Sequence, residues 1–403
     1  MVRRFASGGG MGLAGTSVIV VGAGVAGLAA ARAMALRGAR VTVLEQADAI
    51  REVGAGLQIS PNGAAVLRAL GLGDALALAS MRSAGVHLCD GATGRPVLRM
   101  ALPQAAGPGF HLIHRADLIS LLREGAAEAG VSIRLLQKVV SVDPAAASLT
   151  TETGQTHQAD LLVGADGLHS ILRRTLNGNV APFFTHQVAW RALIPCNPGA
   201  ASVAEVHMGP GRHLVSYPLR GGTLRNIVAV EERRNWVEEG WTLRDDPMDM
   251  RVAFEGFCPR VRGWLDQVVE VGLWGLFRHP VAKHWHQGGS AAILGDAAHP
   301  TLPFLAQGAN LALEDAWVLA DSLDRHSDRA VALRAGQGAR GPRVTRAIAA
   351  ANANARNYHL RGVSRAVAHL GLRAVGTMAP GLMLRRLDWL YGHDVTGVQP
   401  ASP

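Results

Sequence analysis

Cysteine is scarce in this chain of 403 residues, and the spacing of its three cysteines excludes the common classes of zinc site. Cys89, Cys196 and Cys258 stand far apart, without the short intervals that zinc ligands show. The sequence therefore predicts reduced thiols and a cytoplasmic protein. The histidines form no HExxH motif, and His284 and His286 are too close in sequence to share a helix face, so a polar strand edge and no metal site are predicted.

Long apolar runs are also missing. The run over residues 17–31 follows Arg3 and Arg4 as an export signal would, but it contains regularly spaced glycines and is followed by no small-residue cleavage site. It is too short to span a bilayer. We expect no membrane insertion, and a loose tail over residues 1–15.

Acidic residues are fewer than basic ones, at 31 against 40, and the formal net charge is +9. No stretch interleaves basic runs with aromatic residues as a nucleic-acid platform does, so we expect no nucleic-acid partner. A basic protein instead attracts anionic small molecules, such as a dinucleotide or an aromatic acid.

Hydrophobic residues make up 48% of the chain and charged residues 18%, which predicts a globular protein of two or three domains. Three short apolar runs, at 18–21, 161–163 and 291–294, are typical of buried parallel strands, and each leads into a glycine-bearing motif. The first run, a helix over 25–36 and a strand over 41–44 make a complete βαβ unit.

Residues 186–283 differ, because polar and apolar residues alternate there between Gly-rich turns, which predicts antiparallel hairpins. Residues 85–100 look like one more hairpin of that sheet. The predicted fold is α/β, with a discontinuous nucleotide-binding domain (16–84, 105–185 and 285–340), an inserted sheet domain (85–104 and 186–284) and a helical C-terminal region (341–403).

The first glycine motif has the GxGxxG spacing of a dinucleotide site. Its first glycine permits the tight turn, the second lets backbone approach a pyrophosphate, and the third lets helix pack on strand. A carboxylate at the end of the next strand stands where it meets ribose hydroxyls, but it does not distinguish FAD from NAD. The binding residues predicted from this unit are Gly22, Gly24, Ala26, Gly27 and Glu45.

Two further motifs make the prediction more specific. One is Gly164-Ala165-Asp166-Gly167, running on to Arg173, and the other is Gly295-Asp296 with Pro300, Pro303 and Gly308-Ala309-Asn310. Three such motifs in this order resemble the class A flavoprotein aromatic monooxygenases, the family of salicylate and hydroxybenzoate hydroxylases. The resemblance implies a Rossmann-like FAD-binding domain with an inserted antiparallel or mixed β-sheet domain and a helical C-terminus.

The resemblance also implies cofactor contacts. In that family the aspartate of the Gly-Asp motif holds the ribityl chain of FAD, and the helix after the proline loop aims its positive end at the flavin ring. Asp-Gly is also a common turn, and either of Arg51 and Arg115 could be a solvated arginine. The cofactor residues predicted in this way are Arg51, Arg115, Asp166, Gly167, Arg173, Gly295, Asp296, Pro300, Gly308, Ala309 and Asn310.

The chain contains only one GxGxxG motif. A second, permanent NAD(P)H domain is therefore not expected, which agrees with a family in which NADH or NADPH visits as a transient co-substrate.

Substrate residues are expected on the inserted sheet. His213, Val215 and Tyr217 share one strand face by the period of two. In the resembled hydroxylases a His and a Tyr at this spacing handle the substrate phenol, although such residues are also common in half-buried sheets. Arg191 could pair a substrate carboxylate or a surface acid. Pro303 stands where 3-hydroxybenzoate 6-hydroxylase-type members carry glutamine, which puts that substrate in doubt.

The resemblance implies a monooxygenase that uses non-covalent FAD, NADH or NADPH and O₂ to hydroxylate a phenolic or hydroxybenzoate-like ring through a flavin C4a-hydroperoxide. Its oligomeric state would be a monomer or homodimer. The alternatives are a ubiquinone-pathway ring hydroxylase, a flavin oxidase or dehydrogenase without oxygenated product, and a non-catalytic FAD-binding regulator.

Overall fold

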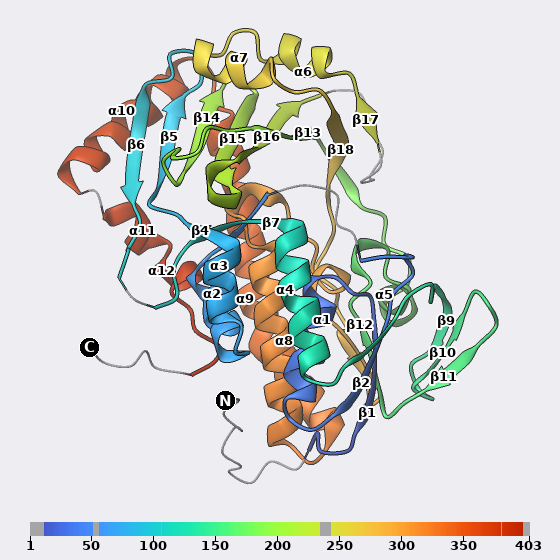
Figure 1. The fold of residues 1–403 in the computed structure, drawn as a ribbon. Helices are drawn as coiled ribbons and strands as arrows, with labels where there is room; N and C mark the ends of the chain where they lie inside the picture. Colours follow the sequence, from blue (N-terminus) through green and yellow to red (C-terminus); the bar gives the residue numbers. More distant parts are fainter. Residues whose placement is uncertain (1–11, 51–55, 106, 234–242, 380, 398–403) are drawn as a thin grey trace.

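The structure is a computed structural model that describes residues 12–50, 56–105, 107–233, 243–379 and 381–397 (Figure 1). Its first layer is a six-stranded sheet in the order β19-β20-β12-β1-β2-β8. All neighbours pair in parallel except β19 with β20. The strands are β1 (Ser17–Val21), β2 (Arg40–Leu44), β8 (Ser132–Arg134), β12 (Leu161–Gly164), β19 (His286–Gln287) and β20 (Ala291–Ile293).

Helices pack against this sheet because small side chains let them approach closely. Every alanine of the first helix except the last is buried, and this helix contacts α4 and α8. Among the described helices, none combines the length and apolar character that crossing a bilayer needs. The helices of this layer are α1 (Val25–Ala35), α2 (Pro61–Ala69), α3 (Gly73–Ala79), α4 (Arg115–Glu128), α5 (Ile171–Asn177) and α8 (Gly308–Arg325).

The second layer is an eight-stranded sheet in the order β17-β18-β13-β16-β15-β14-β5-β6. It is mixed, because the early hairpin β5–β6 joins it through a parallel pairing with β14. Two short helices, α6 (Pro247–Ala253) and α7 (Pro259–Leu265), cover its outer face (Figure 1). The strands are β5 (Gly85–Asp90), β6 (Pro96–Ala101), β13 (Phe183–Pro195), β14 (Val203–Gly209), β15 (Arg212–Leu219), β16 (Leu224–Glu232), β17 (Arg244–Asp245) and β18 (Val271–Arg278).

Two three-stranded sheets complete the strand arrangement. One of them, β3-β7-β4, precedes α4 and contacts the eight-stranded sheet through β15. The strands are β3 (Gly56–Ile59), β4 (Ser80–Arg82), β7 (His111–His114), β9 (Val139–Asp143), β10 (Ser148–Thr151) and β11 (Thr156–Gln158).

Two expected boundaries do not coincide with the observed elements. Leu13 is fully buried in the core, so the loose tail does not extend over all of residues 1–15. The boundary expected at 340/341 falls inside one long helix, which continues through Pro342. Four helices make up the C-terminal part: α9 (Arg329–Tyr358), α10 (Gly362–Met378), α11 (Leu382–Arg386) and α12 (Asp388–Tyr391). The predicted α/β fold with an inserted mixed sheet and a helical C-terminus is confirmed.

Candidate active site

The first glycine motif forms a tight turn between β1 and α1. Gly22 has φ +100°, and a Cβ there would lie 2.5 Å from the carbonyl oxygen of Ala165. A Cβ at Gly27 would collide with the carbonyl oxygen of Gly22. At Gly24 the position of a Cβ is open space, with no heavy atom within 4 Å. The turn therefore leaves room in front of the α1 N-terminus, beside Ala26, and this is the space that a pyrophosphate needs.

Glu45 follows β2 and holds this turn. Its Oε2 accepts a hydrogen bond from the Ala23 amide at 2.8 Å, and its Oε1 accepts one from the Ala47 amide at 3.0 Å. Each carboxylate oxygen has a second lone pair, so these bonds still allow a ribose hydroxyl to bind.

The second motif, from Gly164 to Arg173, holds the loop of the third motif, Gly295-Asp296, in place. Asp166 Oδ2 accepts from the Ile171 amide at 2.9 Å, while Oδ1 is buried and meets no hydrogen-bond partner within the described residues. Gly167 has φ +72°, as its turn requires. Arg173 donates to the carbonyl oxygens of Ala297 and Ala298, each at 2.9 Å, and to that of Pro280 at 2.6 Å. The guanidinium predicted to contact the cofactor therefore holds the loop that carries Asp296 in place.

Asp296 lies in the loop after β20, beyond Gly295. Protein surrounds it closely enough to raise the pKa of its carboxyl, although His299 and Arg115 act in the opposite direction. The side chain is nevertheless exposed, which is typical of a group that lines a recess. Asp296 and Arg115 are 181 positions apart but close enough to interact, so two predicted cofactor residues come together.

The proline loop leads into α8, whose first residues, Gly308 and Ala309, are partly exposed, whereas Pro300 is buried. Asn310 is fully buried. Its Oδ1 accepts from the Ser60 amide at 3.0 Å, and its Nδ2 donates to the Ala306 carbonyl oxygen at 2.7 Å. The side chain predicted to bind cofactor thus fixes the start of α8 against the loop before α2. The predicted contact of Arg51 lies outside the described residues.

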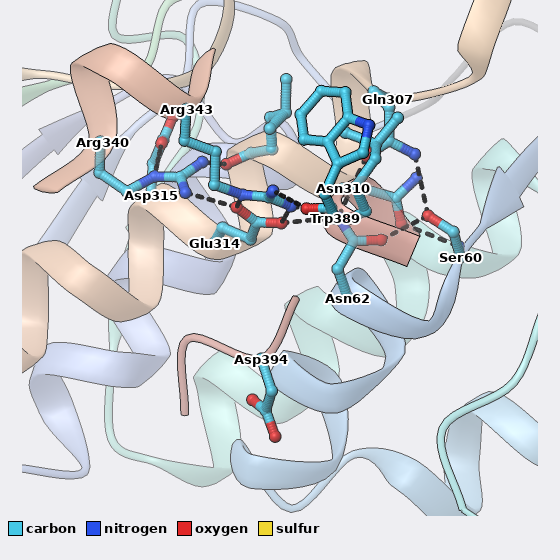
Figure 2. Close-up of polar contacts among 12 residues, drawn as sticks. Ser60, Asn62, Gln307, Asn310, Glu314, Asp315, Arg340, Arg343, Trp389 and Asp394 are labelled. Atoms are coloured by element: carbon cyan, nitrogen blue, oxygen red, sulfur yellow. Dashed lines mark hydrogen bonds and ion pairs between the residues drawn. The ribbon is translucent and has the colours of Figure 1, made fainter. Parts of the chain in front are cut away.

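A buried ionic network continues from this point along α8 (Figure 2). Arg340 on α9 pairs with Glu314 and, at 2.7 Å, with Asp315; Arg343 donates to both oxygens of Glu314 at 2.7 Å. Asp315 also binds His299 and accepts from the Gly295 amide at 3.0 Å. Sequence reasoning missed this network, although it connects α9 to the Gly-Asp motif through Asp315 of α8.

The inner face of the eight-stranded sheet carries the predicted substrate residues. Arg191 on β13, Val228 on β16 and Val215 on β15 stand in register and form a row that we call the central row. All three are partly exposed, whereas His213 and Tyr217 in the flanking rows are buried. Solvent therefore reaches the sheet between these two side chains.

His213 and Tyr217 lie on opposite sides of the central row, two residues before and two residues after Val215 on β15. Four strand positions separate their Cα atoms by about 13 Å. Tyr217 packs on β3, where a Cβ at Gly56 would lie 2.8 Å from its hydroxyl, and burial raises the pKa of this hydroxyl. The His213 ring lies 5.7 Å from that of Phe304 in the proline loop, so it approaches the third motif.

Two further side chains at this face have no signal in the sequence. Asn226 is opposite Tyr217 on β16; its Oδ1 accepts from the Gly56 amide at 2.7 Å, and its buried Nδ2 has no partner among the described residues. His359, at the end of α9, is hydrogen-bonded to His213 at 2.7 Å. Neither could be found from the sequence, because each partner is more than 100 positions away.

One possible set of metal ligands lies on the outer face of the same sheet. The ligand atoms of Cys89, Glu205 and His207 are within 4.8 Å of one another. Burial and Glu205 raise the pKa of the Cys89 thiol to about 11, which favours the neutral form. Arg260 already pairs with Glu205 at 2.7 Å and repels a further cation. We therefore keep the prediction that the protein uses no metal here.

The fold and these three motifs together define a flavoprotein in which a Rossmann-like domain contacts a second, mixed sheet. Residues 15–331 match the family described as "FAD binding domain", and the chain belongs to this family. It is 35% identical to a 3-amino-4-hydroxybenzoate 2-monooxygenase of Streptomyces cremeus over 398 residues, 96% of this chain and 97% of the relative. It is 33% identical to a 3-hydroxybenzoate 6-hydroxylase of Polaromonas naphthalenivorans over 394 residues, 94% of this chain and 96% of the relative.

Solved structures agree on the fold. A salicylate hydroxylase in a substrate complex superposes with a TM-score of 0.78 at 24% identity, covering 96% of this chain and 99% of that one. Klebsiella pneumoniae HpxO, complexed with FAD and uric acid, superposes with a TM-score of 0.81 at 23% identity, covering 93% of this chain and 97% of that one. The predictions of an FAD-dependent monooxygenase and of NADH or NADPH as its co-substrate are confirmed at the level of this family.

Proposed function

We propose that this monooxygenase hydroxylates a phenol that carries a carboxylate, of the hydroxybenzoate type. The central row is the observation on which the proposal depends. It offers a cationic end at Arg191 and an apolar surface at Val215 and Val228, with a proton-accepting histidine beyond. A hydroxylated benzoate has the matching order of carboxylate, apolar ring and phenol. The two relatives named above act on hydroxybenzoates, which supports the same class of substrate.

The cofactor residues fit FAD. The space at Gly24, the unpartnered Asp166 oxygen and the exposed Asp296 carboxylate are features that a large polar ligand would use. We propose that the first motif with Glu45 holds the nucleotide end, and that Asp296, Arg115 and the α8 N-terminus hold the flavin end. Bound FAD would supply electron transfer from NAD(P)H and activation of O₂.

We also propose the domain division given above, with its last boundary moved to the end of α9. We further propose that the protein is a monomer or homodimer.

The protein's own task is then to place the ring and to move a proton. A phenolate is a better nucleophile than a phenol, so a base near the hydroxyl favours oxygen insertion into the ring. Burial and its neighbour His359 hold the pKa of the His213 ring well below the ordinary value, so the ring is neutral and has a lone pair that can accept the proton. Tyr217 keeps its proton and can donate a hydrogen bond.

Replacing His213 by alanine should lower kcat for hydroxylation by about a hundredfold, the usual contribution of a positioned base. Tyr217→Phe should lower kcat by about fivefold, because the change removes one hydrogen bond and little side-chain volume. Both variants should retain FAD, which flavin absorbance after gel filtration would show. Native turnover in both variants would contradict the assigned roles.

Replacing Arg191 by methionine should raise KM for carboxylated phenols by about tenfold or more, with little change for a phenol that has no carboxyl group. Burial lowers the pKa of Arg191 to about 10, but the guanidinium remains charged at neutral pH. It stacks over Trp274 at 4.3 Å, so it is already oriented. Steady-state kinetics on 3-hydroxybenzoate and phenol would measure the difference, and an equal change in KM for both would exclude carboxylate pairing.

The proposed function itself is tested by NAD(P)H oxidation with FAD-loaded protein and a panel of phenols, benzoates and hydroxynicotinates. We expect stimulation by a carboxylated phenol and a product heavier by one oxygen. Peroxide in place of that product would indicate an oxidase. No stimulation by any ring of the panel would favour a bulky isoprenoid substrate, as in ubiquinone-type hydroxylases.

A further inference from the structure

A chain of hydrogen bonds runs from the buried His213 to the protein surface. His213 Nδ1 lies 2.7 Å from His359 Nε2, and His359 Nδ1 lies 3.0 Å from Glu232 Oε1. His213 is 2% exposed and His359 is 5% exposed, whereas the Glu232 side chain is 39% exposed. Since the three residues come from β15, the end of α9 and the end of β16, the tertiary fold alone brings them together.

The direction of these hydrogen bonds follows from the carboxylate at the outer end. Burial alone would raise the pKa of Glu232, but hydrogen bonds from Arg361 and His359 outweigh it and keep the group ionised. An ionised carboxylate only accepts hydrogen bonds, so His359 carries its proton on Nδ1 and accepts at Nε2. His213 must then donate from Nδ1, which leaves its Nε2 without a proton.

The free lone pair of His213 faces no competing group. Within the described residues, no hydrogen bond reaches Nε2 of His213, and the ring is bordered by Phe304, Tyr358 and His359. The orientation of the three residues thus prepares His213 as a base.

Burial, helped by two nearby cations, holds the pKa of the His359 ring below its ordinary value. Burial lowers the pKa of its ring, Glu232 acts against this, and the cations Arg361 and Arg212 lower the pKa further. Gln187 Nε2 lies 3.4 Å from Nδ1 and adds no charge. An imidazole that does not stay protonated, placed between a buried base and an exposed carboxylate, can pass a proton on.

We propose that His213, His359 and Glu232 are a proton relay that carries the substrate's phenolic proton to solvent. This inference rests on the proposed function. The phenolic O–H bond breaks as His213 Nε2 takes the proton; Nδ1 of His213 gives its proton to His359 Nε2, and Nδ1 of His359 gives its proton to Glu232. Glu232 releases that proton to water. One proton enters and one leaves, no electrons are transferred, and both rings end in the opposite tautomer.

The relay is tested by the rate at which a bound phenol loses its proton. The probe is 3-hydroxy-4-nitrobenzoate, which changes colour on deprotonation, mixed rapidly with FAD-loaded protein at a pH below its phenol pKa. His359→Ala should slow the colour change by about tenfold or more, and added imidazole should restore it. Glu232→Gln should slow it without such rescue, because the exit group is lost and no space for imidazole is opened. Glu231→Gln is the matched control, since Glu231 pairs with Arg212 and Arg233 and does not contact His359.

The outcomes separate the relay from the proposed function. A native rate in both His359→Ala and Glu232→Gln, with the probe bound, overturns the relay and leaves the proposed function standing. A slow His359→Ala that imidazole does not restore, together with a native Glu232→Gln, shows a purely structural histidine and also overturns the relay. If the probe does not bind native protein, as followed by flavin fluorescence, the proposed substrate class fails and the relay fails with it.

Discussion

Replacing Arg340 by methionine should lower the free energy of unfolding by about 3–5 kcal/mol, the cost of removing one partner from a buried ion-pair network. Arg340 is 3% exposed, and it pairs with Glu314 and Asp315, which are 0% and 2% exposed. Methionine fills much of the same volume but supplies no charge. Guanidinium denaturation of the FAD-loaded protein, followed by tryptophan fluorescence, would measure the loss.

The matched control is Arg334→Met, which removes an exposed arginine from the same helix and should change stability by less than about 0.5 kcal/mol. Equal stability of the two variants would show that the buried ion pairs contribute little to stability.

Acid should weaken the same network. Burial alone would raise the pKa of Asp315, but His299 and Arg340 outweigh it and hold the pKa below the ordinary value. A carboxyl with a lowered pKa in the folded state contributes its full stability above the unfolded pKa of about 4, and this contribution is lost as the pH falls further. The difference in free energy of unfolding between native protein and Arg340→Met should therefore become smaller below about pH 4.

Replacing Gly24 by alanine should weaken FAD binding by about a hundredfold, or about 3 kcal/mol, while the apo-protein remains as stable as before. The backbone at Gly24 has φ −79° and ψ −174°, a conformation that alanine adopts readily. The added methyl group meets no protein atom within 4 Å, so its only obstacle is the pyrophosphate that we place there. FAD titration of the apo-protein, with a thermal melt of the same sample, would measure both effects.

Two other glycines give this experiment its controls. Gly338 in α9 also faces open space but is remote from the glycine turn, so Gly338→Ala should leave FAD affinity unchanged. Gly27→Ala should lower both affinity and stability, because its methyl group collides with the Gly22 carbonyl oxygen. Native FAD affinity in Gly24→Ala would show that the nucleotide does not pass over this turn.

The parts of the fold that local patterns determine could be predicted from the sequence. The apolar runs that became β1, β12 and β20 and the alternating segments that became β14, β15 and β16 were all assigned correctly. The parts that depend on distant partners could not. Arg173 and Asn310 were predicted to contact the cofactor, but the hydrogen bonds of their side chains go to other parts of the protein, 107 to 125 positions away for Arg173 and 250 to 252 for two of the three Asn310 bonds.

The length of α9 could not be predicted from the sequence for the same reason. The boundary predicted at 340/341 falls inside α9, and this helix continues through Pro342 although proline removes a helix hydrogen bond at a cost of about 3 kcal/mol. Arg340 and Arg343, one on each side of the proline, tie both halves of the helix to Glu314 on α8. No local rule contains this compensation, since the acid and the arginines belong to different helices.

The order of strands in the six-stranded sheet has a consequence for how the protein is made. Among the described strands β1 is synthesised before the others, yet its neighbour β12 and the strand beyond it, β20, are made much later. At about 5–20 residues per second, Gly22 waits roughly 15–60 s before Gly308 is synthesised. During that time the nascent chain has an apolar strand with an unpaired edge and no complete nucleotide site. FAD therefore meets a complete nucleotide site only on chains whose translation has passed Gly308.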